Sequence, residues 1–363
     1  MTKYREIYRT EQLPVTQNRM FATQYEALNC VKGDVTLVQD LETGLIFNRA
    51  FKPELLEYGP DYQNEQATSS AFRKHLDEVT EIIQRHFSGK SLIEVGCGKG
   101  FFLEHLALDG FDIKGVDPAY EGKNPAITKA YFDLGIGIPR EGIILRHILE
   151  HIPDPVNFLS TIKMTNGGRG AVYIEVPCFD WICKHYAWFD VYYEHVNYFR
   201  LEDFYRMFEK VYEGGYLFGG QYLFVIADLA TLRSPEFSDT QPAEVPIDFT
   251  SRIYAYAGII KDSISDNGTL KQSAVWGGAS KGVIFTLFMQ RAEAAVNYVI
   301  DINPAKQGKY IGGSGFLVYA PEEALSMLEP GSNIFIMNPN YLSEIVAQSG
   351  DKYNYIMVSH EKI

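Results

Sequence analysis

Apolar and polar positions divide the chain into stretches of different period. Residues 1–66 carry no sustained helical period and hold short strand-like runs that Gly, Asn and Pro interrupt. From Ser69 or Ser70 to Phe87, apolar residues recur at helical spacing, which predicts an amphipathic helix with a serine N-cap. Short apolar runs and helical segments alternate after this helix, which is typical of a parallel, doubly wound sheet.

This predicted sheet should bind its ligand along one edge. Its strands are expected at 91–95, 112–116, 129–132, 142–146 and 171–176, with two further strand-like stretches near 210–226. Ligands bind such sheets at the carboxyl ends of the strands, so the loops that follow these strands should meet there. An insertion rich in aromatic residues, 179–199, follows the fifth strand directly and should lie over this edge.

A polar, proline-bearing linker at 231–246 precedes a second, smaller strand–turn–helix pattern. This pattern is predicted as a helix at about 247–264, a strand at 274–276, a glycine-rich turn, a helix to about 292, and strands at 297–300 and 333–337. The chain is therefore expected to have three parts, 1–66, 67–230 and 231–363.

A glycine-rich turn joins the first strand of the predicted sheet to its helix. Three glycines alternate with other residues after Glu94, and glycine permits the backbone dihedrals and the close ligand approach of such a turn. The next strand ends in Asp117 and Pro118, where an acid usually binds a ribose diol. Together these features resemble the cofactor site of class I S-adenosylmethionine (SAM)-dependent methyltransferases.

The resemblance suggests a role for each of these positions. Glu94 is expected to bind the backbone of the turn or the cofactor's methionine amino group, and Asp117 its ribose hydroxyls. Asp133 is expected at the adenine amino group, and Arg146 and His147 beside the sulfonium. The predicted cofactor-binding residues are Glu94, Gly96, Cys97, Gly98, Gly100, Asp117, Pro118, Asp133, Arg146 and His147.

Composition and charge restrict the partners. The chain of 363 residues is long enough for two or three domains, and its net charge of −13 argues against a nucleic-acid-binding surface. Its cysteines, Cys30, Cys97, Cys178 and Cys183, show no C-x-x-C spacing, so neither a zinc site nor a disulfide framework is predicted. The start lacks an apolar signal core, and no run approaches the ~20 apolar residues of a membrane span, so we expect a cytoplasmic protein.

A second group of reactive side chains lies in the aromatic insertion, at Tyr192, Glu194 and His195. Histidine is the side chain best suited to accept a proton near neutral pH, and an adjacent acid can raise its basicity. A nearby tyrosine can donate a hydrogen bond to a developing enolate oxygen. We therefore predict that His195, made more basic by Glu194, is a general base above the cofactor.

Nearly the whole chain resembles the nucleotide-sugar C-methyltransferases, which add branch methyl groups to deoxysugars. The segments that carry this resemblance are 44–48, 51–56, 94–100, 149–152, 174–177, 192–195, 278–282, 300–301, 306–310, 338–341 and 344–345. It implies an α/β enzyme with a small N-terminal β-containing unit, a central class I SAM methyltransferase doubly wound sheet, and a C-terminal Rossmann-like domain. The implied acceptor is a small molecule, a nucleotide-diphosphate sugar.

The same resemblance implies catalytic and substrate-binding roles. His195 removes a proton next to a ketone, a tyrosine binds the enolate oxygen, and the carbanion takes the methyl group of SAM. The implied catalytic residues are His195, Glu194, Tyr192 and Tyr62, with Tyr58 as second candidate for the last. The implied substrate-binding residues are Gly278, Ala279, Ser280, Lys281 and Asn338, with Lys281 at the diphosphate.

The chain departs from the family in its N-terminal unit, which commonly binds zinc through two pairs of cysteines. Asp40 and Thr43 stand about where the second pair lies, so neither zinc nor another bound metal is expected. Three alternatives stay open. They are an O- or N-methyltransferase that uses His195 toward another acceptor, a nicotinamide-dependent oxidoreductase built on 274–301, and a non-catalytic SAM-binding scaffold.

Overall fold

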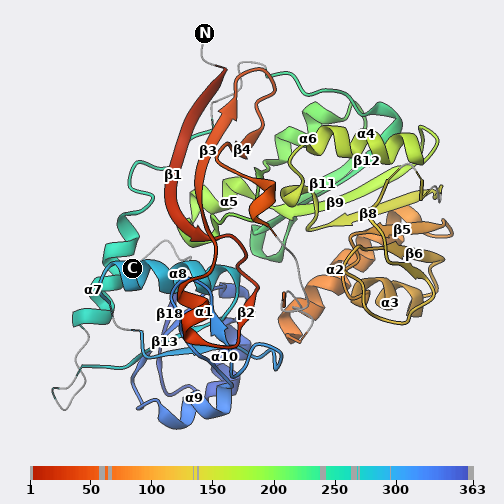
Figure 1. The fold of residues 1–363 in the computed structure, drawn as a ribbon. Helices are drawn as coiled ribbons and strands as arrows, with labels where there is room; N and C mark the ends of the chain where they lie inside the picture. Colours follow the sequence, from red (N-terminus) through yellow and green to blue (C-terminus); the bar gives the residue numbers. More distant parts are fainter. Residues whose placement is uncertain are drawn as a thin grey trace.

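The computed structural model describes residues 3–56, 62–63, 68–133, 135–136, 139–237, 243–262, 268, 270–294 and 296–358. In this part of the chain, the largest sheet has the strand order β11-β12-β9-β8-β5-β6-β7 (Figure 1). Its strands are β5 (Leu92–Val95), β6 (Ile113–Val116), β7 (Ile127–Thr128), β8 (Gly142–Arg146), β9 (Ala171–Pro177), β11 (Val211–Leu217) and β12 (Tyr222–Asp228). Strands β5 to β9 are parallel, and β12 and β11 continue the sheet antiparallel. The expected class I methyltransferase sheet is confirmed.

Helices cover both faces of this central sheet (Figure 1). They include α2 (Ser70–Phe87), α3 (Phe101–Leu108), α4 (Pro155–Thr165) and α6 (Leu201–Met207). Ser69 caps α2, because its hydroxyl accepts hydrogen bonds from the backbone N–H groups of Ala71 and Phe72. The strand predicted at 129–132 lies at 127–128 instead, since the Ile127 side chain packs against Gly100 at the start of α3.

A second, antiparallel sheet has the order β1-β3-β4-β10. Its strands are β1 (Tyr4–Pro14), β3 (Lys32–Asp40), β4 (Ile46–Asn48) and β10 (Asn197–Tyr198). The sequence did not indicate β1, because most of its side chains are only partly buried and form no apolar run. Asp40 closes the turn after β3, where its carboxylate accepts hydrogen bonds from the backbone N–H groups of Glu42 and Thr43 at 2.7 and 3.2 Å.

The third sheet is parallel and has the order β16-β14-β13-β17-β18. Its strands are β13 (Ser273–Trp276), β14 (Tyr298–Ile300), β16 (Val318–Tyr319), β17 (Asn333–Ile336) and β18 (Asn354–Met357). The helices around it are α7 (Ser251–Asp262), α8 (Ser280–Arg291), α9 (Pro321–Met327) and α10 (Leu342–Ser349). Helix α7 begins later than the predicted 247, because residues 247–250 form a turn.

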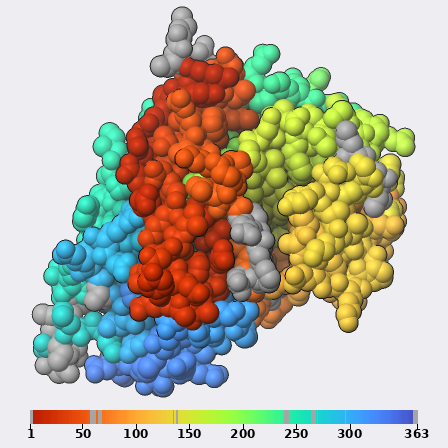
Figure 2. Space-filling view, viewed as in Figure 1, coloured from red at the N-terminus to blue at the C-terminus, as the bar shows by residue number. Residues whose placement is uncertain are grey.

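Three contacts hold the sheets together. Strand β10 comes from the segment after β9 but pairs with β4, and β2 (Met20–Phe21) pairs with β15 (Tyr310–Ile311). The aromatic insertion forms α5 (Phe179–Lys184) and a short helix at 188–190, where Trp188 stacks on Phe285 of α8. Figure 2 shows residues near the N-terminus (red) side by side with both C-terminal (blue) and central (green) residues.

Among the described helices, none combines the length and the apolar composition that crossing a membrane requires.

Candidate active site

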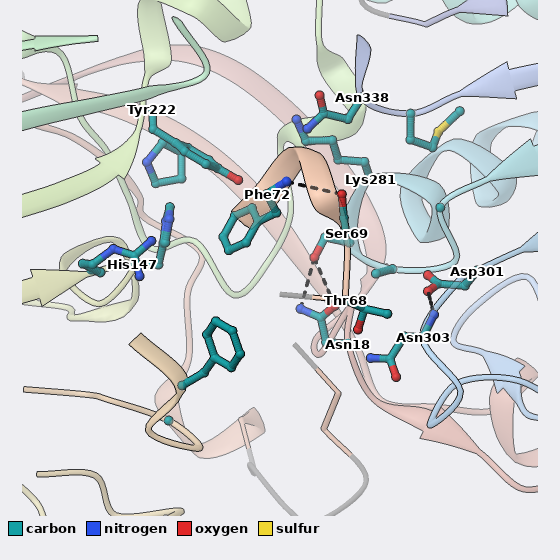
Figure 3. Close-up of a pocket in the computed structure, with 18 of the residues that line it drawn as sticks. Asn18, Thr68, Ser69, Phe72, His147, Tyr222, Lys281, Asp301, Asn303 and Asn338 are labelled. Atoms are coloured by element: carbon teal, nitrogen blue, oxygen red, sulfur yellow. Dashed lines mark hydrogen bonds between the residues drawn. The ribbon is translucent and has the colours of Figure 1, made fainter. Parts of the chain in front are cut away.

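A cavity of about 410 Å³ lies between the central sheet and the third sheet, with Asn18 and Tyr62 of the N-terminal part in its lining. It is bounded by the loops after β5, β6 and β8, by the start of α2, by the aromatic insertion, and by the loops after β13 and β14. Figure 3 shows His147 and Tyr222 on one side of the cavity and Asp301 and Asn303 on the other. Ligand sites are expected at such strand ends in an open α/β sheet.

The glycine turn after β5 is closed by Asp117. The backbone N–H of Gly98 donates to Asp117 Oδ2 at 2.8 Å, and that of Ala119 donates to Oδ1 at 2.7 Å. Each carboxylate oxygen therefore keeps one lone pair for a further donor, so Asp117 can accept both hydroxyls of a ribose. A Cβ at Gly96 would lie 2.1 Å from Ile148 Cδ1, which explains the glycine there.

Glu94 provides a buried acidic position at the end of β5. In the described residues its Oε2 has no hydrogen-bond partner, and its side chain lines the cavity. Burial raises the pKa of Glu94 to about 7, although the nearby Arg146 guanidinium opposes that rise. An ammonium group would satisfy this carboxylate. The site thus offers acceptors for the amino group and the ribose of SAM, so the residues present fit that cofactor.

The pKa of Glu94 predicts that cofactor affinity depends on pH. An ammonium group binds the ionised carboxylate, so below pH 7 binding must release a proton. The affinity for S-adenosylhomocysteine (SAH) should then fall by up to about tenfold per pH unit below 7. Calorimetric titration at pH 6 in buffers of different ionisation enthalpy measures the proton release directly. Glu94→Gln should remove this pH dependence, and an unchanged dependence in that variant would contradict the assignment.

Glu175, at the end of β9, is the centre of a buried group of charges. Its carboxylate lies 2.8 Å from His75 Nε2, 3.2 Å from Arg146 Nε and 3.0 Å from His147 Nε2, and it accepts the Tyr173 hydroxyl at 2.7 Å. Burial alone would raise the pKa of Glu175, but Arg146 and His75 hold it well below its ordinary value. Glu175 therefore fixes the end of the neighbouring strand β8, from which Arg146 and His147 face the cavity.

His147 has an unusual backbone. Its φ is 53°, in the left-handed region that residues with a Cβ rarely adopt. Burial lowers the pKa of His147, but the Glu150 and Glu175 carboxylates beside it outweigh burial and raise it to about 9. His147 is therefore cationic at neutral pH, and its ring centroid lies 4.5 Å from that of Tyr222.

His195 lies in the cavity wall but is not paired with Glu194. Burial, together with the nearby His151 and His147, holds the pKa of His195 well below its ordinary value. The Glu194 carboxylate instead accepts the Tyr62 hydroxyl at 2.7 Å and the Gln17 backbone N–H at 2.5 Å. The prediction that Glu194 raises the basicity of His195 is therefore wrong, because its side chain points to the N-terminal segment.

Hydrogen bonds connect the three parts of the chain around the cavity. Asn18 Nδ2 contacts the Tyr62 hydroxyl at 3.3 Å and the Ser280 hydroxyl at 3.1 Å. Lys281 Nζ lies 2.9 Å from Asp190 Oδ2 and donates to Gln221 at 2.8 Å. These two partners hold the Lys281 ammonium in place, and the Asp190 carboxylate balances its charge.

Most of the predicted site residues line this one cavity. They are Glu94, Gly96, Cys97, Gly98, Asp117, Arg146, His147, Tyr192, His195, Tyr62, Ala279, Ser280, Lys281 and Asn338. Five predicted residues lie outside its lining, namely Gly100, Pro118, Asp133, Glu194 and Gly278. Asp133 borders a separate shallow hollow and accepts the Gly135 N–H, so the structure does not place it at the adenine position expected from spacing. Tyr58 lies outside the described residues.

Several lining residues were not predicted. They are Asn18, Glu150, His151, Tyr222, Asp301, Asn303 and Lys306. Asp301 follows a strand and a glycine turn as Asp117 does, so the sequence carried a signal for it. Asn18 and Tyr222 reach the cavity only through long-range packing, which local patterns do not show.

Comparisons with known proteins agree with this geometry. Residues 67–211 match a family model described as a methyltransferase domain, and residues 248–355 match one described as a C-methyltransferase C-terminal domain. The chain is 23% identical over 322 residues to the C-methyltransferase NovU of Streptomyces niveus, covering 78% of this chain and 76% of that protein. A ubiquinone biosynthesis O-methyltransferase of Chromobacterium violaceum is 30% identical over 118 residues, covering 26% of this chain and 51% of that protein.

Among solved structures, the PH0226 protein from Pyrococcus horikoshii OT3 aligns with a TM-score of 0.35 and 11% identity, covering 47% of this chain and 99% of that one. The strand order and the matched models together identify the chain as a SAM-dependent methyltransferase, which confirms the predicted enzyme class. Within that class, it is similar to C-methyltransferases over most of its length. The glycine turn at 277–282, on which the oxidoreductase alternative rests, lies inside the segment that matches the C-methyltransferase C-terminal domain.

Proposed function

We propose that this protein C-methylates a keto-sugar carried by a nucleotide. The observation that carries the proposal is a repeat of the Asp117 arrangement on the opposite side of the cavity. There the Gly278 N–H donates to Asp301 Oδ2 at 2.9 Å and the Asn303 N–H donates to Oδ1 at 2.8 Å. Two acid–glycine pairs of the same construction suit two nucleoside-bearing ligands, the cofactor and the acceptor.

The second pair differs from the first in one contact. Lys306 Nζ lies 3.2 Å from Asp301 Oδ2, and both side chains are buried. Oδ2 then uses both lone pairs, while Oδ1 keeps one, so Asp301 can accept one further hydroxyl where Asp117 can accept two. The acceptor's nucleoside would therefore be held through a single sugar hydroxyl. The fixed ammonium of Lys281 uses two of its three N–H donors on Asp190 and Gln221, and the third can donate to the diphosphate.

The residues between the two pairs suit proton removal from carbon. The low pKa of His195 keeps its ring neutral at physiological pH, so it has a lone pair for the α-proton of a ketone. Burial raises the pKa of Tyr192 well above its ordinary value, so its hydroxyl stays protonated and can donate to the enolate oxygen. Tyr62 supplies a second hydroxyl from the N-terminal segment. SAM, when bound, supplies the electrophilic methyl group.

Deuterium exchange tests the reaction class. The enzyme is incubated in D₂O with SAH and with UDP- or dTDP-linked 4-keto-6-deoxyglucose, and NMR follows the protons next to the ketone. Exchange without methyl transfer is expected for a C-methyltransferase. Methylation of a hydroxyl from SAM without any exchange would instead favour the O-methyltransferase alternative. The similarity to ubiquinone biosynthesis O-methyltransferases is the reason to test that alternative.

Paired substitutions test the two acid–glycine sites. Asp301→Asn should weaken binding of the nucleotide sugar roughly 10- to 100-fold, the effect of losing a hydrogen bond to a charged group, and leave the affinity for SAH within about twofold. Asp117→Asn should weaken binding of SAH by the same factor and leave the affinity for the nucleotide sugar within about twofold. Calorimetry with SAH and with UDP or dTDP measures both affinities, and the melting temperature reports whether each variant folds. Equal losses for both ligands in either variant would contradict two separate sites.

A further inference from the structure

Glu150 is a buried carboxylate with no role in the reaction described so far. Its side chain is 1% exposed, and neither oxygen has a hydrogen-bond partner in the described residues. The cationic His147 lies 3.5 Å away, from its Nδ1 to Oε1, so it forms an ion pair with Glu150 but no hydrogen bond. Because a buried carboxylate that accepts no hydrogen bond is costly, its retention beside the cavity indicates that a donor reaches it during the reaction.

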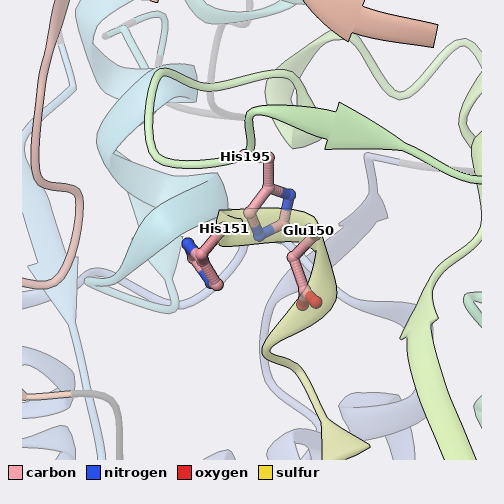
Figure 4. Close-up of side chains that lie close together, drawn as sticks. All are labelled: Glu150, His151 and His195. Atoms are coloured by element: carbon pink, nitrogen blue, oxygen red, sulfur yellow. The ribbon is translucent and has the colours of Figure 1, made fainter. Parts of the chain in front are cut away.

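The side chains of Glu150, His151 and His195 lie close together (Figure 4). One ligand-type atom from each lies within 4.8 Å of the others. Glu150 belongs to a short helix at 149–151, and its backbone carbonyl accepts the Val196 N–H at 2.8 Å, directly after His195. The Asn197 amide also donates to the Ile152 carbonyl at 2.6 Å. These bonds fix the loop of His195 against the helix of Glu150.

The charges around this group favour a proton over a metal ion. His195 is faced by His151 and Tyr192, with ring centroids 5.0 and 4.1 Å away, and positive charge comes from His147 and Lys281. His151 donates through Nδ1 to the Glu194 carbonyl at 2.9 Å. The positive charges of His147 and Lys281 would repel a divalent metal ion, whereas the single positive charge of a protonated His195 can be balanced by the Glu150 carboxylate.

We propose, on the basis of the proposed function, that Glu150 is the positioning residue that stabilises the His195 imidazolium formed in proton abstraction. The substrate C–H bond breaks, the proton moves to His195, and the electron pair passes to the carbonyl oxygen. The proton stays on His195, whose new positive charge is then paired with the Glu150 carboxylate. Glu150 thus takes the part that the sequence had suggested for Glu194.

The test uses the full-length enzyme with SAH and the two nucleotide-linked keto-sugars in D₂O. Glu150→Gln should lower the exchange rate about 10- to 100-fold while the affinity for SAH changes little. Since losing the carboxylate lowers the pKa of His195, the acidic limb of the rate profile should move to lower pH. Glu150→Asp should recover most of the rate. The exposed Glu121→Gln is the matched control and should leave rate and profile unchanged.

A double substitution identifies the partner of Glu150. In a His195→Asn background, Glu150→Gln should cause no further loss of exchange, whereas a further loss would show that Glu150 acts through His147. A rate loss without a shift of the acidic limb would reduce Glu150 to a structural role. Exchange that EDTA abolishes and Zn²⁺ restores would overturn the proposal in favour of a metal site. If the unaltered enzyme exchanges neither sugar, the proposed function fails first, and this role fails with it.

Discussion

Replacing His195 with Asn is expected to lower the rate of methyl transfer about 10²- to 10⁴-fold, the usual contribution of a general base. Asn keeps polar atoms in the cavity wall but cannot accept the proton. The affinity for SAH should be nearly unchanged, because the acceptors for the cofactor are Glu94 and Asp117. Transfer of radiolabelled methyl from SAM to the nucleotide-linked keto-sugar measures the rate, and calorimetry measures the affinity.

A histidine outside the cavity serves as the control for this experiment. His105 lies on α3 and forms a partly exposed ion pair with Asp77 at 3.6 Å. His105→Asn should therefore leave methyl transfer within about twofold of the unaltered enzyme, as surface pairs contribute little. Full activity of His195→Asn would remove the proposed base. It would mean that another group accepts the proton.

Replacing Glu175 with Gln should lower the free energy of unfolding by about 3–5 kcal/mol, as expected when one partner of a buried charge group is removed. Arg146 would remain buried without its counter-charge, and His75 and His147 would lose an anionic partner. The melting temperature should fall by roughly 10 °C, since each kcal/mol shifts it by about 2–4 °C in a protein of this size class. Scanning calorimetry measures the change.

Glu213 provides a matched comparison for Glu175. It also pairs with an arginine and a histidine, Arg85 and His86, but at the surface. Glu213→Gln should cost no more than about 1 kcal/mol. The low pKa of Glu175 also predicts how its contribution to the free energy of unfolding depends on pH. The contribution is present above the ordinary glutamate pKa and is lost as pH falls through the lowered value. Acid should therefore narrow the difference in unfolding free energy between Glu175→Gln and the unaltered protein. A constant difference at every pH would contradict this origin.

Local sequence signals predicted the central sheet and much of its cofactor edge. Glycines at 96–100, the acid Asp117 and the Ser69 cap each act through neighbours close in the chain, so residue type and spacing are sufficient. Asp154 acts in the same local way, since it caps α4 by accepting the Asn157 N–H at 3.0 Å. Strand β1 was missed because a partly exposed strand lacks an apolar run.

Local sequence signals could not predict the direction of side chains in the irregular insertion. Glu194 precedes His195 in the chain, yet its carboxylate contacts Gln17 and Tyr62, and it is a carboxylate oxygen of Glu150 that lies within 4.8 Å of a His195 ring nitrogen. No helical or strand period fixes which way a loop side chain points, so proximity in sequence gave the wrong partner. The adenine position expected for Asp133 rested on spacing alone, and spacing does not fix the path of a loop.

Strand β10 has a consequence for how the protein becomes active as it is made. Asn197 pairs with Phe47, so completing the N-terminal sheet closes a loop of roughly 150 residues, which carries an entropy cost and slows folding. A ribosome has released three strands of that sheet long before the fourth emerges. Because His195 lies just before β10, the docking of this late strand also sets the proposed base in place. Refolding chains should therefore gain turnover only after residues 47 and 197 have come together.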